Sequence, residues 1–159
     1  MKITRLEIIG QLQTKWPELV DGLPNATNLA IPDINYWMPK KSDVESLVIN
    51  TFFENYKYKV QVFDCDDFSL VVHAFVVQER YRQIEKREIS KEEWFPWSFG
   101  QVWGTKFQGK TMKHAINIIM TSDNGIMFLE PQSSDRGVFD GVSLWKTDSL
   151  KDNIYFVRM

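Results

Sequence analysis

A single cysteine stands among carboxylates near the middle of the chain. Cys65 is the only cysteine in 159 residues, and Asp64, Asp66 and Asp67 flank it. Apolar residues follow at spacings of three and four over 68–76, which predicts an amphipathic helix. Asp64 is the expected N-cap, with Asp67 as the acidic partner of a capping box. Cys65 would then lie in the first turn, where the helix dipole favours a thiolate, the nucleophilic form of cysteine.

Two later residues supply the other groups that thiol chemistry needs. A thiol nucleophile requires a base for its proton and a third group that orients the base. His114 opens one predicted strand, and Glu130 ends the next. The other histidine, His73, lies on the same predicted helix as Cys65, about 12 Å away at 1.5 Å per residue. Because that separation is too long for proton transfer, His114 is the candidate base by elimination.

The contact between base and acid depends on a hairpin. Predicted strands over 114–120 and 126–130 flank an Asn-Gly pair, which is typical of a tight β-turn. A tight turn would leave His114 and Glu130 on the order of 13 Å apart. Direct contact requires a longer loop or a bulge. The alternatives for the orienting role are Asn117 and Asp135.

Composition excludes several classes of protein and of site. The net charge is −2 and no basic run is present, which argues against a nucleic-acid partner. One cysteine excludes an internal disulfide and a CxxC metal site. The N-terminus is charged where a signal peptide would be apolar, and no long apolar run follows. These features predict a soluble, cytoplasmic protein with no signal peptide and no membrane partner.

The predicted architecture is one α+β domain over 1–159. Residues 1–35 contain prolines and turn-forming residues and are expected to form an irregular N-terminal arm, although 3–20 also has a helix-like apolar spacing. The Cys65 helix is expected to continue towards residue 88 and to pack on an antiparallel sheet. Residues 94–107 are rich in aromatics, which would either line a ligand groove or pack in the core.

Three motifs carry a resemblance to a known family. Asp-Cys-Asp-Asp-Phe at 64–68, His-Ala-Ile-Asn at 114–117 and Leu-Glu-Pro-Gln at 129–132 resemble the C-terminal domain of fungal agglutinins that join a lectin to a calcium-dependent, papain-like cysteine protease. The resemblance implies a papain-like fold and a thiol protease acting on a protein or peptide substrate. It implies Cys65 as nucleophile, His114 as base and Glu130 as orienter. The lectin half of that family is missing here, so sugar binding does not carry over.

The resemblance also implies calcium. Carboxylates near a thiol raise its pKa, and a bound Ca²⁺ would neutralise them. Gln61 and the backbone amide of Cys65 are the candidates for an oxyanion hole. The candidate metal ligands are Asp64, Asp66, Asp67 and Gln132.

Two other functions remain open from the sequence. The cysteine motif is a near miss of the Asp-Cys-Ser-Gly-Phe of NlpC/P60-like cell-wall amidases, although the Ser-Gly pair is absent. Alternatively, the chain is a non-catalytic binding or structural module on the same fold. The sequence predicts neither the oligomeric state nor the substrate specificity.

Overall fold

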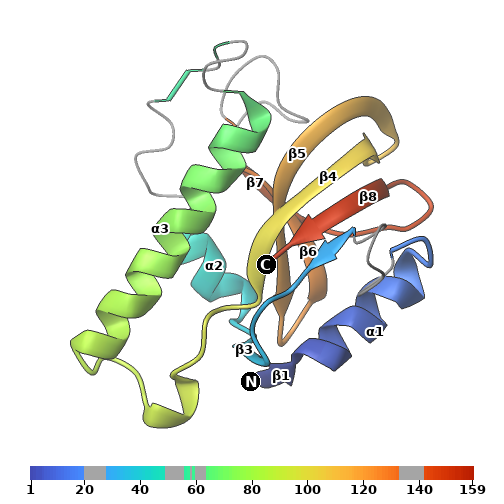
Figure 1. Ribbon diagram of the computed structural model, residues 1–159. Helices are drawn as coiled ribbons and strands as arrows, with labels where there is room; N and C mark the ends of the chain where they lie inside the picture. The colour runs from blue at the N-terminus through green and yellow to red at the C-terminus, as the bar shows by residue number, and fades with distance from the viewer. Residues whose placement is uncertain (20–27, 49–55, 58, 60–63, 133–141) are drawn as a thin grey trace.

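A six-stranded sheet forms the centre of the molecule. The computed structural model describes residues 1–19, 28–48, 56–57, 59, 64–132 and 142–159. The strand order is β2-β8-β4-β5-β6-β7 (Figure 1). Four neighbouring pairs are antiparallel, and only β2 and β8 run parallel. The strands are β2 (Leu29–Ala30), β4 (Phe99–Phe107), β5 (Lys110–Thr121), β6 (Gly125–Glu130), β7 (Ser143–Lys146) and β8 (Asn153–Arg158).

Three helices, a short 3-10 helix and a small second sheet complete the described elements. The strands β1 and β3 pair antiparallel and bring the start of the chain beside the segment that leads into α2. The bounds are β1 (Lys2–Thr4), α1 (Arg5–Lys15), β3 (Asn35–Trp37), α2 (Lys41–Val48), α3 (Cys65–Glu85) and the 3-10 helix Lys91–Glu93.

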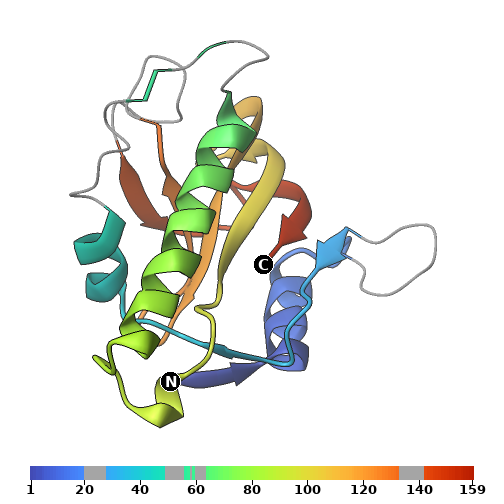
Figure 2. The same ribbon diagram turned by 60° about the vertical axis from the view of Figure 1, so that its left-hand side comes forward.

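The two faces of the sheet bury different side chains because successive strand residues point to opposite sides. Ile116, Ile118 and Phe128 belong to one buried cluster with Ile8 and Leu12 of α1. The alternate residues form a second cluster with α2 and α3. Figure 2 shows α3 and α1 on opposite sides of the sheet. The second cluster comprises Val44, Val48, Val72, Val76, Trp97, Phe99, Ile119 and Leu129.

The predicted helix start at the cysteine is confirmed. The helix α3 begins at Cys65, and Asp64 is its extended N-cap residue. The Asp64 amide donates to Oδ2 of Asp67 at 3.1 Å, which is the reciprocal contact of a capping box. The helix ends at Glu85, slightly earlier than expected, because Arg87 takes a positive φ of 55°. The predicted hairpin strands are also confirmed as β5 and β6.

The predicted papain-like α+β fold is wrong. That fold class was expected to place one long helix on an antiparallel sheet. The observed sheet is mixed, since β2 pairs with β8 in parallel, and most of the structure rests on its six strands. Its second face is covered as well, by α1. The long helix is therefore one of two helical covers on a central sheet.

The N-terminal arm is also corrected. Residues 2–15 form β1 and α1 instead of an irregular segment. Thr4 caps α1 by accepting from the Glu7 amide, and the Thr4 amide donates to Glu7 in return. This capping box and the buried residues of α1 explain why the helix forms despite its polar composition. Residues 20–27 lie outside the described residues.

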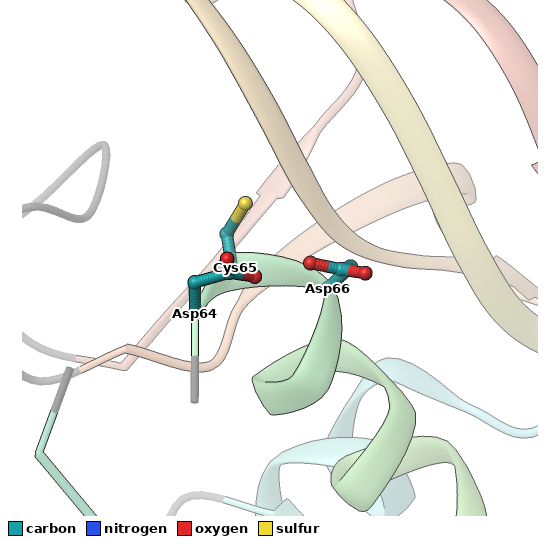
Figure 3. Close-up of side chains that lie close together, drawn as sticks. All are labelled: Asp64, Cys65 and Asp66. Atoms are coloured by element: carbon teal, nitrogen blue, oxygen red, sulfur yellow. The ribbon is translucent and has the colours of Figure 1, made fainter. Parts of the chain in front are cut away.

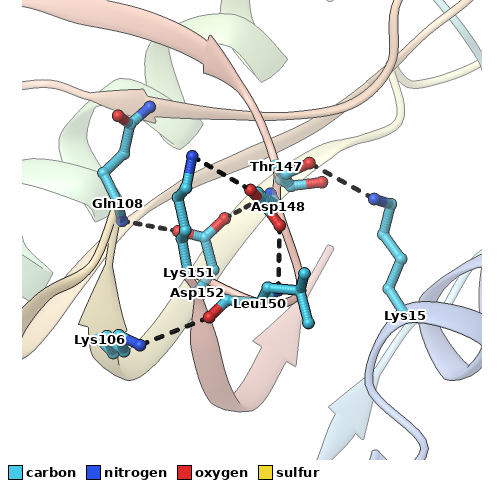
Figure 4. Close-up of polar contacts among 8 residues, drawn as sticks. All are labelled: Lys15, Lys106, Gln108, Thr147, Asp148, Leu150, Lys151 and Asp152. Carbon is cyan, nitrogen blue, oxygen red and sulfur yellow. Dashed lines mark hydrogen bonds and ion pairs between the residues drawn. The ribbon is translucent and has the colours of Figure 1, made fainter.

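A compact hydrogen-bonded turn joins β7 to β8 and fastens α1 to the sheet (Figure 4). The carboxylate of Asp152 accepts from the amides of Gln108 and Asp148, both at 2.7 Å. The carbonyl of Asp152 accepts from the indole N–H of Trp16 at 3.3 Å. Lys15 Nζ donates to the carbonyl of Thr147 at 3.4 Å. The end of α1 is thereby fixed against the C-terminal turn.

Within the described residues, no helix combines the length and apolar character needed to cross a bilayer.

Strand β4 approaches the end of the chain too closely for a side chain at Gly100. A Cβ there would lie 2.0 Å from the Arg158 carbonyl oxygen, which is a backbone atom that cannot turn away. We expect Gly100→Ala to lower the free energy of unfolding by about 3 kcal/mol, because the two strands must move apart. Urea unfolding measures this change.

The matched control is Gly10→Ala on the exposed face of α1. A Cβ at Gly10 meets nothing within 4 Å. This substitution should raise the free energy of unfolding by about 0.5–1 kcal/mol, because alanine is a better helix former than glycine. Equal effects of the two substitutions would contradict the close packing of β4 on β8.

Candidate functional site

The hairpin of β5 and β6 brings His114 and Glu130 into direct contact. The imidazole Nε2 of His114 lies 2.6 Å from Oε2 of Glu130. Both side chains are buried, with 4% and 0% of their surface exposed. The second carboxylate oxygen of Glu130 accepts from the backbone amide of Gln132 at 3.1 Å. Glu130 is therefore the residue that orients the imidazole.

The direct contact is possible because the turn is longer than the tight Asn-Gly turn, as the sequence analysis required. Thr121 pairs with Gly125, so three residues form the loop in place of a two-residue Asn-Gly turn. The Thr121 hydroxyl donates to the carbonyl of Gly125 and accepts from the amide of Asn124. This register pairs Asn117 with Leu129. Glu130 consequently lies diagonally across from His114 on the same face, within reach of both side chains.

A β-bulge in the neighbouring strand lies directly opposite His114. The pairing of β4 with β5 shifts between Gly104 and Lys106, and Gly104 is the partner of His114. Bulges bend strands and re-aim side chains. The ring of Phe107, just beyond the bulge, meets the imidazole of His114 edge to face at 6.0 Å. The bulge thus shapes the wall against which the imidazole is held.

The imidazole of His114 also reaches the Cys65 thiol. Burial alone would lower the pKa of His114, but hydrogen bonds with Cys65 and Glu130 raise it to about 9. At neutral pH the ring is therefore an imidazolium between a sulfur and a carboxylate. The structure brings together all three residues that the sequence analysis paired.

Two polar side chains that the sequence analysis did not assign to this position hold the start of α3 on the sheet. Asn117 Nδ2 donates to the carbonyls of Ser69 and Gly100 at 2.8 and 3.0 Å. Gln101 Nε2 donates to the hydroxyl of Ser69 at 2.9 Å and to the carbonyl of Asp66 at 3.3 Å. Asn117 and Gln101 are almost fully buried. Their polarity within otherwise apolar strands is the sequence signal for such an anchor.

Asn117 does not orient His114, although it was one of the predicted alternatives. It lies three positions along β5 from His114, so the two side chains point to opposite faces. The other alternative, Asp135, lies outside the described residues. Gln61, the candidate for an oxyanion hole, also lies outside them.

The acidic residues around the thiol form a tight group (Figure 3). Ligand atoms of Asp64, Cys65 and Asp66 lie within 4.8 Å of one another. A hydrogen bond with the Asp64 carboxylate raises the pKa of Asp66, and partial burial raises it further. Asp67 gives one oxygen to the helix cap. Asp64 and Asp66 are therefore the predicted metal ligands that the structure draws together.

Gln132, the fourth predicted metal ligand, is fully buried. Neither its amide nitrogen nor its amide oxygen finds a hydrogen-bond partner among the described residues. The same holds for Oδ1 of Asp64. The side-chain amide of Gln132 and Oδ1 of Asp64 can therefore still form hydrogen bonds or bind a cation.

Comparison with protein-family models identifies the family of the chain. A family model described as the agglutinin C-terminal domain matches residues 36–136. The chain belongs to the agglutinin C-terminal family. The match covers every residue of the cluster that the structure describes, from Asp64 to Gln132. A comparison with curated proteins found no match.

Solved structures share the fold of this agglutinin-type chain. One is described as a PSL1a–E64 complex, with 18% identity and a TM-score of 0.68 over 99% of this chain and 50% of the other. Another is the Polyporus squamosus lectin bound to the glycan epitope Neu5Aca2-6Galb1-4GlcNAc, with 19% identity and a TM-score of 0.67 over 99% of this chain and 49% of the other. The chain thus spans about half the length of these structures.

These findings correct the functional prediction. The matching family model is described as agglutinin C-terminal, and the shared fold is that of about half of a lectin chain, which overturns the assignment as a papain-like thiol protease. A protein or peptide substrate has no support from them. The NlpC/P60-like amidase is equally without support. Of the functions that the sequence left open, the non-catalytic binding module is the one that the findings favour.

The raised pKa of His114 makes stability depend on pH. The folded-state pKa of about 9 exceeds the reference value of 6.5, so the protonated ring stabilises the fold below pH 6.5 and loses this effect as pH rises through 9. We expect wild type to exceed His114→Gln in unfolding free energy at pH 6, and this advantage to shrink by up to about 3 kcal/mol by pH 10. Denaturant unfolding across this range measures it.

The control is His73→Gln. Burial, and then the nearby Arg158, lower the pKa of His73, so its contribution is lost only as pH falls below 6.5. The difference between wild type and His73→Gln should therefore be flat from pH 7 to 10. A similarly flat difference for His114→Gln would contradict the ionised cluster.

Proposed function

We propose that the chain is a non-catalytic binding module of the agglutinin family and that its ligand binds at the Cys65–His114–Glu130 cluster. The observation that carries the proposal is the buried His114, fixed between the Glu130 carboxylate and the Cys65 thiol. A charged group that is already paired in the ligand-free protein needs no reordering when a ligand arrives. Cys65 and Asp64 are partly exposed and Asp66 is exposed, so the cluster has an open side.

The polar groups on this open side suit a ligand rich in hydroxyl groups. Carboxylates of Asp64 and Asp66 accept hydrogen bonds, and the thiol of Cys65 adds a polarisable contact. The glycan bound by the Polyporus squamosus lectin is one probe for this site, and E64 is another. This chain spans about half of each structure, so binding of either ligand to this chain is part of the proposal.

The lone thiol provides a direct reporter of occupancy. Iodoacetamide can alkylate only Cys65, since the chain has one cysteine. We expect a saturating probe, either Neu5Aca2-6Galb1-4GlcNAc or E64, to slow alkylation at least about tenfold by covering the thiol. Intact-mass spectrometry follows the reaction. His73→Gln is the matched histidine control and should show the same protection as wild type.

Two results would overturn the proposal. One is an alkylation rate that neither probe changes at any concentration up to millimolar. The other is hydrolysis of a protein substrate by wild type and not by Cys65→Ser, which would make the module catalytic. Casein digestion with both proteins provides this second readout.

We further propose that calcium binds beside the cluster. The donor set fits a hard cation, because Asp64 and Asp66 offer carboxylate oxygens within 4.8 Å of each other and Oδ1 of Asp64 is buried without a hydrogen-bond partner among the described residues. The hydrogen bond with the Asp64 carboxylate, which raises the pKa of Asp66, reflects how closely the two acidic groups lie, and a cation between them would relieve their repulsion. The cysteine sulfur is too soft a ligand for calcium and would remain outside the coordination shell.

Calcium binding to the folded state raises the melting temperature. We expect a higher melting temperature in millimolar calcium than in chelator, because only the folded chain places the two carboxylates together. Asp66→Asn should weaken this increase, whereas Glu85→Gln, an exposed change at the far end of α3, should not. Identical melting curves with calcium and with chelator would exclude the site.

A further inference from the structure

A cavity lies along α3, away from the cysteine end of the helix. It occupies about 680 Å³ between the C-terminal half of α3 and the β2–β8 edge of the sheet. Figure 1 shows α3 on one side of β4 and the strand β8 on the other. The volume lies within the range of small-molecule sites, about 300–1,000 Å³. Its apolar lining includes Leu29, Val76, Val77, Ile84, Trp97 and Phe99.

The apolar stripe of α3 continues into this cavity. His73, Val77 and Tyr81 recur at a spacing of four, which places them on one face of the helix. Val77 and Tyr81 nevertheless remain 52% and 65% exposed. The helix therefore presents apolar surface that neither buried cluster covers. Trp97 and Phe99 form the cavity's opposite wall, so part of the aromatic-rich segment lines a groove while also packing in the core.

The charged side chains of the cavity are mostly positive. Arg5, Arg80 and Arg158 line it, against the acidic side chain of Asp33, and the last residue of the chain, Met159, lies beside Arg158. Arg80 is fixed, because it donates to the carbonyls of Phe95 and Glu93. Arg158 is exposed, and its guanidinium makes no hydrogen bond or ion pair within the described part of the chain. Its charge acts on His73 across the cavity.

We infer that this cavity binds a small amphipathic acid, with an apolar body along α3 and a carboxylate head at Arg158. Charge complementarity selects an anionic head, since a cationic one would face three arginines. The apolar body would cover the exposed parts of Val77 and Tyr81. The neutral His73 ring, packed against Phe99 at 6.1 Å, offers an N–H beside the head group. This site is independent of the binding proposed at Cys65.

Titration calorimetry of the purified chain with decanoate and with decan-1-ol tests the inference. The two probes have the same apolar body, and only decanoate carries a charge. We expect wild type to bind decanoate about fivefold more tightly than decan-1-ol. Arg158→Gln should remove this preference and leave decan-1-ol binding unchanged. Arg87→Gln, an exposed arginine beyond the end of α3, is the charge-matched control and should preserve it.

A second variant tests the apolar wall. Val77 is half exposed, so Val77→Glu should fold normally while it introduces a carboxylate into the cavity. We expect it to weaken decanoate binding at least about tenfold. The inference is overturned if wild type binds neither probe at millimolar concentration, or if Arg158→Gln and Val77→Glu bind decanoate as wild type does. It is also overturned if sedimentation shows a dimer that Val77→Glu dissociates, because the face would then serve a second copy of the chain.

Discussion

The position of the cysteine depends on a small polar anchor inside an apolar interface. Asn117 and Gln101 reach from the sheet to the first turn and a half of α3 and bind its carbonyl groups and the Ser69 hydroxyl. Apolar contacts alone would allow the helix to slide or rotate, because they are not directional. A buried amide that loses its partner costs about 1–3 kcal/mol, so any shift of the helix is penalised. Cys65 is thereby held at a fixed distance from the sheet.

The same strand carries the anchor on one face and the imidazole on the other. Odd-numbered Asn117 points to α3, and even-numbered His114 points to the face of Phe107 and Glu130. A bulge in β4 lies opposite His114, and the imidazole meets a thiol carried by the start of α3. The result is an ionised cluster whose parts come from three elements. The domain thus buries a charged imidazole whose partners, Glu130 and Cys65, are already in place in the folded chain.

Local patterns in the sequence predicted individual helices and strands. The hairpin register and the packing of α1 depend on contacts between distant residues, which local patterns do not show. The Asp64 cap, the start of α3 and the two hairpin strands follow from the capping chemistry and the apolar spacing of a few neighbouring residues. The three motif residues Cys65, His114 and Glu130 were also chosen correctly as neighbours. The register of the hairpin stayed open between a tight turn and a longer loop, because it depends on how Thr121 closes the turn. The helix-like apolar spacing over 3–20 indicated α1, but its packing on the second face of the sheet was not predicted, because that contact is made far along the chain. The assignment of a protease rested on resemblance, and the same three residues are compatible with binding.

The protonation state of His114 tests this account most directly. An NMR titration of the two imidazoles, assigned with His73→Gln, gives the pKa of each ring in the folded protein. The account predicts a pKa of about 9 for His114, held up by Cys65 and Glu130, and a pKa below 6.5 for His73. Asn117→Leu should lower the pKa of His114 by loosening the helix that carries the thiol. A His114 pKa at or below 6.5 in wild type would contradict the account, because the ring could not then be an imidazolium held between the thiol and the carboxylate.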